Sequence, residues 1–272
     1  MLTLRRRVKR PYRIDWHGEA EAVLPFLQVD DWELPTVEIE IDGEPVRAWI
    51  DTGGDMLTLP HAYDVEPLGR FSGTFDGVYG RVEEVRLGPV TVRAVPVMTA
   101  GLERPVIGTG FLRRFLPTLD YPGRRLVLRP PDAEPGDGVG VPFRIAATHL
   151  MLVDGVLNET PMTFLVDSGL RDEQGAAFAA TAAALAVAGI PLPATAPERG
   201  SSGVGEVTLE LGRFPIARLA VGSLVQEDLL GLYGAFPEGL EQIDGLVSHG
   251  FLRRYRWTID FTRMTMRFAP PG

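Results

Sequence analysis

An internal repeat constrains the fold of this chain more than any other feature of its sequence. The segment 108–115 (Gly-Thr-Gly-Phe-Leu-Arg-Arg-Phe) returns as 248–255 (Ser-His-Gly-Phe-Leu-Arg-Arg-Tyr), and the offset is 140 residues. The same offset relates Leu-Asp-Tyr at 119–121 to Ile-Asp-Phe at 259–261. A duplication of this kind predicts two halves that share one architecture.

Both halves have the pattern of β-structure. Each contains two strand-like segments joined by a turn, and the second strand leads directly into an aspartate. These elements are 37–41, Asp42-Gly43, 46–50 and Asp51 in the first half, and 150–157, 158–161, 162–166 and Asp167 in the second. Each repeat is also followed by an alternating strand, at 125–129 and 264–268. The sequence therefore predicts an all-β fold with a few short helices, one of them in the Ala-rich segment 176–189.

A Pro- and Gly-rich segment separates the two halves, with a boundary near residue 135. The predicted organisation is a basic N-terminal arm and lead-in at 1–30, a first lobe at 31–131, a linker at 132–141 and a second lobe at 142–270. Each half also contains a Gly-rich hairpin candidate, at 77–80 and 203–205. Glycines at such tips fit either an ordinary hairpin or a lid over a cleft.

Composition narrows the classes of function. The 272 residues include no cysteine, which excludes thiol catalysis and disulfides. The net charge of −9 disfavours a nucleic-acid partner, and no apolar run approaches the roughly 20 residues of a membrane helix. The basic N-terminus lacks the apolar stretch of a secretory signal, so the chain as given is expected to be cytoplasmic. No metal or cofactor is expected, because the histidines lack metal-ligand spacing: His17, His61, His149 and His249.

The candidate catalytic residues are two aspartates at matching places in the duplicated unit. Asp51-Thr52-Gly53 and Asp167-Ser168-Gly169 each follow an apolar strand. One such triplet is ordinary turn chemistry, but two at equivalent positions favour a shared site. If a pseudo-twofold axis relates the halves, the residues nearest the axis meet. The two carboxylates would then share one proton and act together as general base and general acid on a water molecule. Thr52 and Ser168 would hold the two loops by reciprocal hydrogen bonds to backbone.

With these residues in view, the sequence resembles the aspartic peptidases, and among them the two-lobed bacterial retropepsin-like and pepsin-like proteins. The resemblance covers nearly all of residues 31–270. It implies an acid-protease fold with a cleft between two barrel-like lobes and a peptide or protein substrate. Because both carboxylates come from one chain, the site would not require an oligomer.

The resemblance also assigns roles to residues around the dyad. Asp55 falls where related viral enzymes have an aspartate that contacts the substrate backbone. Val106-Ile107-Gly108 matches the element behind the catalytic loop, with Ser248 in the place of that glycine in the second half. The flap would comprise Gly77, Tyr79 and Gly80, and the second hairpin contains Gly203 and Gly205.

The second half departs from the family pattern, and this leaves an alternative function open. Leu170 and Arg171 follow Gly169, and Ser248 replaces glycine. Arg171 near the dyad would favour ionised carboxylates and weaken the general acid. The alternative is a peptidase-fold protein that has lost catalysis and binds extended peptides or a protein partner. Separately, the basic arm could lie in the acidic cleft and suppress activity through Arg5, Arg6, Arg7 and Lys9.

Overall fold

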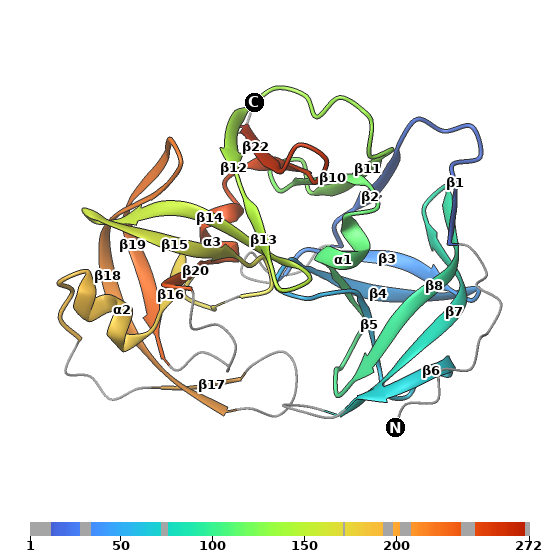
Figure 1. Ribbon diagram of the computed structural model, residues 1–272, viewed down its shortest axis with the longest axis horizontal. Coiled ribbons are helices and arrows are strands. Elements are labelled where there is room, and N and C mark those ends of the chain that lie inside the picture. The colour runs from blue at the N-terminus through green and yellow to red at the C-terminus, as the bar shows by residue number, and fades with distance from the viewer. Residues whose placement is uncertain are drawn as a thin grey trace.

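The computed structural model describes residues 12–27, 34–71, 76–170, 172–192, 198–201, 208–234 and 243–269. The protein is 56% strand and 6% helix, and it forms two similar barrels of six strands. A third sheet lies above both barrels, at the top of Figure 1. The predicted all-β fold with two similar barrels is confirmed.

Barrel one is a ring of six strands in the order β3–β4–β9–β5–β8–β7, which closes because β7 also pairs with β3. Two further strands, β1 and β6, extend it at its edges. The strands are β1 (Arg13–Asp15), β3 (Thr36–Ile41), β4 (Glu44–Asp51), β5 (Leu57–Pro60), β6 (Glu66–Phe71), β7 (Gly77–Leu87), β8 (Val90–Ala100) and β9 (Val106–Gly108).

Barrel two repeats this ring strand for strand in the order β14–β15–β20–β16–β19–β18, with β13 and β17 at its edges. The parallel pair β15–β20 matches the parallel pair β4–β9, and β16–β19 matches β5–β8. The strands are β13 (Arg144–Ala146), β14 (Leu150–Leu157), β15 (Thr160–Val166), β16 (Phe178–Ala180), β17 (Glu198–Ser201), β18 (Thr208–Val221), β19 (Leu224–Tyr233) and β20 (Gly245–Val247).

The third sheet joins the two halves of the chain. Its order is β12–β22–β21–β10–β11–β2, so each half contributes one hairpin. The strands are β2 (Ala22–Pro25), β10 (Leu116–Asp120), β11 (Arg125–Arg129), β12 (Val139–Pro142), β21 (Arg256–Asp260) and β22 (Thr265–Ala269). At its centre Thr118 pairs with Thr258, and their Oγ1 atoms lie 2.7 Å apart. Since these residues are 140 positions apart, the repeat offset places equivalent residues face to face on a pseudo-twofold axis.

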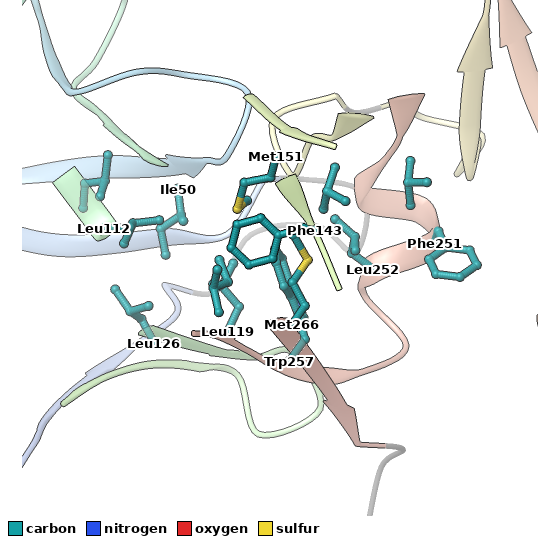
Figure 2. Packing of buried hydrophobic residues seen from close by; sticks show 14 of the residues in the cluster. Ile50, Leu112, Leu119, Leu126, Phe143, Met151, Phe251, Leu252, Trp257 and Met266 are labelled. Carbon is teal, nitrogen blue, oxygen red and sulfur yellow. The ribbon is translucent and has the colours of Figure 1, made fainter. Parts of the chain in front are cut away.

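One apolar core runs through all three sheets. Side chains from the two barrels, such as Ile50 of β4 and Met151 of β14, belong to the same buried cluster as Leu119 and Trp257 of the third sheet. Figure 2 shows these side chains directed towards one another at the junction. The sequence alternation that places them there also sends the neighbouring residues to the outside of each barrel. The halves are therefore held together by a continuous core as well as by β10–β21 pairing.

The helices are short: α1 (Thr109–Leu112), α2 (Ala182–Val187) and α3 (His249–Leu252). Within the described parts of the chain, none has the length and apolar character to cross a membrane. The prediction of one helix over 176–189 is wrong at its first half, because Phe178–Ala180 forms β16 between β19 and β20. Its side chains are almost fully buried there, and pairing on both edges overrides the helix propensity of alanine.

The central threonine pair gives a test of the pseudo-twofold contact. Thr118→Val leaves the buried Thr258 hydroxyl without its partner and should lower the free energy of unfolding by about 1–3 kcal/mol. The double variant Thr118→Val with Thr258→Val replaces both partners by apolar isosteres and should lose less than the sum of the two single losses. Urea denaturation of all four proteins measures this, and strict additivity would contradict the contact.

Candidate active site

The two candidate aspartates lie at equivalent strand ends. Asp51 is the last residue of β4, and Asp167 follows the last residue of β15. In both strands the preceding residue, Ile50 or Val166, is fully buried in the common core. Because successive side chains alternate between the two faces of a strand, both aspartates point out of their barrels. Each retains partial exposure, so both can be reached from solvent.

The carboxylates of Asp51 and Asp167 meet and hydrogen-bond each other. Each also lies against the glycine of the opposite loop. A Cβ on Gly53 would lie 2.8 Å from the carboxyl carbon of Asp167, and one on Gly169 would lie 2.1 Å from that of Asp51. Any residue other than glycine at these two positions would collide with the opposite carboxylate. The glycines thus permit the close approach of the two loops.

Reciprocal hydrogen bonds lock the loops together. The Thr52 hydroxyl donates to the carbonyl of Val166 at 2.9 Å and accepts from the Ser168 N–H at 3.0 Å. In the opposite direction, the Ser168 hydroxyl donates to the carbonyl of Ile50 at 3.1 Å and accepts from the Thr52 N–H at 3.0 Å. Thr52 and Ser168 are both fully buried, so these four bonds are shielded from water. The predicted reciprocal contact is present in both directions.

Burial raises the pKa of both aspartates above the usual range of a carboxyl group. For Asp167 the rise is large, because the charge and the hydrogen bond of Asp51 add to the effect of burial. For Asp51 burial is opposed by backbone hydrogen bonds, chiefly from the Gly53 N–H, which lies 2.7 Å from Oδ1. Gly169 and Leu170 donate in the same way to Asp167. The pair therefore keeps one shared proton at pH values where an isolated aspartate has lost it.

Two further side chains influence the dyad electrostatically. His149, from the turn before β14, lowers the pKa of Asp51. Tyr121, which follows β10, has a buried hydroxyl, and burial together with the charges of the two aspartates raises the pKa of its phenol. Its ring packs edge-on against His249 at 5.3 Å. No spacing in the sequence indicates this role of His149, because only the long-range fold brings it to Asp51.

Gly108 and Ser248 lie behind the Asp51 and Asp167 loops, and they differ in residue type although the backbone hydrogen bonds around them match. Gly108 packs on backbone, since a Cβ there would lie 2.7 Å from the carbonyl oxygen of Gly54. Ser248 instead donates its hydroxyl to the carbonyl of Ala176 and accepts from the Gly250 N–H at the start of α3. In both halves the next backbone N–H then bonds the loop, from Thr109 to Gly54 and from His249 to Leu170. Ser248 therefore fits behind the Asp167 loop through its own hydrogen bonds.

Asp55 contacts the second half of the chain. Its carboxylate accepts a hydrogen bond from the Thr148 hydroxyl at 3.0 Å and lies 3.8 Å from Nδ1 of His149. Asp55 and Thr148 line a cavity of about 260 Å³ together with Met56 and Arg113. The substrate-contacting role predicted for Asp55 stays a prediction, while its link to Thr148 was not foreseen.

The flap role of Gly77, Tyr79 and Gly80 stays a prediction, but the structure places these residues in a strand of the β6–β7 hairpin instead of at its tip. Tyr79 and Gly80 also pair with β8. Gly80 is required by packing, since a Cβ there would lie 2.6 Å from a methyl group of Val65. Tyr79 is 44% exposed on this strand. The second candidate hairpin, with Gly203 and Gly205, lies outside the described residues, as do Arg171 and the basic arm.

No protein-family model matches this chain, and no curated protein matches it. Among the residues that the structure describes, no group of three or more acidic or histidine side chains could hold a metal ion.

The reciprocal bonds predict a specific response to mutation. Thr52→Val removes the donor to Val166 and the acceptor for Ser168, so the free energy of unfolding should fall by about 2–4 kcal/mol. Thr52→Ser keeps the hydroxyl and should lose only about 1 kcal/mol through its missing methyl group. Chemical denaturation compares the two variants. Equal losses would show that the hydroxyl does not hold the loops.

The raised pKa values predict how stability depends on pH. A carboxyl with a raised folded pKa stabilises the fold while protonated, fully below the unfolded value of about 4, and this stabilisation is lost as pH rises through the folded pKa. Asp167→Asn removes the titration, so its stability relative to the unmodified protein should increase as pH rises from about 4 towards neutrality.

Denaturation curves between about pH 3 and 8 test this dependence. Asp132→Asn on the exposed linker is the matched control and should differ from the unmodified protein by no more than about 0.5 kcal/mol throughout. A constant difference between Asp167→Asn and the unmodified protein would contradict the raised pKa.

Proposed function

We propose that this protein is an aspartic endopeptidase of the bilobed, pepsin-like or retropepsin-like kind. The observation that carries the proposal is the hydrogen-bonded pair of Asp51 and Asp167, with a raised pKa for both carboxyls. A proton shared by two carboxylates that retain partial exposure suits the activation of water, since one member can accept a proton while the other donates one. The two similar barrels and the reciprocal bonds of Thr52 and Ser168 support the same proposal.

The proposed reaction needs only these two groups and water. The ionised carboxylate takes a proton from the water as its oxygen bonds to the carbonyl carbon of the scissile peptide. The protonated carboxyl gives its proton to the carbonyl oxygen, and a neutral tetrahedral diol forms. The carboxyl that took the first proton then delivers it to the amide nitrogen. The carbon–nitrogen bond breaks, a diol hydroxyl returns its proton to the other carboxylate, and the products are a carboxylic acid and an amine.

The alternative is a peptidase-fold protein that binds extended peptides or a protein partner without cleaving them. Three sequence features motivate it, namely Leu170, Arg171 and Ser248. Ser248 fits its position by hydrogen bonding, and Leu170 donates its N–H to Asp167 while its side chain packs on an apolar cluster. Neither residue separates the carboxylates, and Arg171 lies outside the described residues. These contacts favour the catalytic proposal over the alternative.

Peptide hydrolysis tests the proposal directly. Incubation with a diverse peptide library between about pH 4 and 7 should yield cleavage, and both Asp51→Asn and Asp167→Asn should lower kcat/KM by at least about 10³-fold. Both substitutions preserve shape, and circular dichroism checks that the variants remain folded. Cleavage that survives both substitutions would disprove the dyad mechanism, and binding without cleavage by the unmodified protein would favour the alternative.

A further inference from the structure

The outer faces of the two barrels beside the dyad carry different chemistry. Trp49 lies two residues before Asp51 on β4, so its side chain projects from the same face of the strand as that aspartate. In the second half, Leu165 has the same relation to Asp167. Neither residue belongs to the core that fills the barrels. The residues that flank the reacting carboxylates are therefore a tryptophan on one side and a leucine on the other.

On the side of barrel one, the ring of Trp49 contacts a positively charged side chain. The guanidinium of Arg104 lies over its ring, with its central carbon 4.6 Å from the ring centroid. Val106 pairs with Trp49, and its Cγ1 would lie 3.6 Å from a Cβ on Gly54 in the Asp51 loop. This surface is thus continuous with the catalytic loop. Within the described parts of the chain, Arg104 forms no ion pair with a carboxylate.

On the side of barrel two, the equivalent residues are apolar and buried. Leu165 pairs with Leu246, and both belong to a second buried cluster on which Leu170 packs. The repeat offset places Asp244 where barrel one has Arg104. The carboxylate of Asp244 accepts a hydrogen bond from the Thr163 N–H at 2.8 Å, so its partner lies within barrel two. At these two equivalent positions barrel one therefore has a cation, and barrel two has an acidic residue.

We propose that Arg104 and Trp49 form a subsite for an acidic side chain of the peptide substrate, next to the scissile bond on the side of barrel one. This inference rests on the proposed function, because it assumes that an extended peptide crosses the dyad. The ligand chemistry is a carboxylate of glutamate or aspartate, held by a charge-assisted hydrogen bond.

The geometry of the Arg104 side chain fits this role. Contact with the Trp49 ring restrains the guanidinium of Arg104. The N–H donors of a guanidinium match a carboxylate in a bidentate arrangement. A pre-oriented donor group loses less conformational freedom when a ligand binds than a flexible lysine would. The residues at the equivalent positions of barrel two, Leu165 and Leu246, are apolar and offer no such donor.

A series of statine-containing peptides tests the subsite independently of turnover. Glu, Gln or Lys is placed at each position flanking the statine, and affinity is measured by calorimetry at ~0.15 M salt to screen the overall negative charge. The unmodified protein should bind the Glu peptide about tenfold more tightly than the Gln peptide at one position next to the statine. Arg104→Gln should abolish this ratio, and Arg104→Glu should shift the preference to Lys.

A matched control separates local from overall charge. Arg256→Gln removes one positive charge from an exposed residue of the third sheet and should leave the Glu-to-Gln ratio unchanged. An absent Glu preference, or one that persists in Arg104→Gln, would overturn the subsite. Cleavage of library peptides without any Glu preference would overturn the subsite and leave the proposed function standing. Selective, Arg104-dependent binding without cleavage would support the subsite and overturn the proposed function. Absence of both binding and cleavage would overturn the subsite and the proposed function.

Discussion

The contact between the carboxylates of Asp51 and Asp167 is the constraint on which the rest of the structure depends. Two carboxylates close enough to hydrogen-bond repel each other unless a proton lies between them, and burial raises the free-energy cost of ionising both. Such a pair persists only if the surrounding backbone holds it rigidly. The buried bonds of Thr52 and Ser168 supply this restraint locally. The third sheet and the continuous core fix the two barrels to which the loops belong.

The duplication contains a second pair of aspartates, and the contrast shows how environment sets their roles. Asp120 and Asp260 also end equivalent strands and are buried. Asp120 accepts from the Gly123 N–H and from Nε of Arg125. Burial tends to raise the pKa of Asp260, but hydrogen bonds from Thr262 and Arg263 outweigh it and lower that pKa. Asp120 and Asp260 therefore hold turns through hydrogen bonds, whereas Asp51 and Asp167 share a proton.

The sequence predicts most of the fold because its signals are local and repeated. The Asp42-Gly43 turn has φ values of +50° and +89°, as a tight hairpin requires, and the strands around it lie where alternation places them. The same holds for the dyad residues, which form one short motif at two equivalent places. The helix prediction for the Ala-rich segment 176–189 fails in part because a short buried strand and a helix have similar composition, and only the neighbouring strands decide between them.

The surroundings of the dyad could not be predicted in this way, because they depend on long-range pairing. His149 reaches Asp51 through a turn of the opposite half, and Arg104 reaches Trp49 because β9 runs parallel to β4. No spacing along the chain encodes either contact. Both arise where the two halves of the duplication have diverged in sequence.

This divergence has a physical meaning under the proposed function. A peptide has a direction, whereas a perfectly twofold site would bind it equally well in both orientations. The dyad itself must stay nearly symmetric, since its two members exchange the roles of acid and base. Specificity for one orientation must then come from residues outside the dyad, where the copies differ. Arg104 opposite Asp244, and Gly54 opposite Leu170, are differences of this kind, and they lie on the faces that flank the carboxylates.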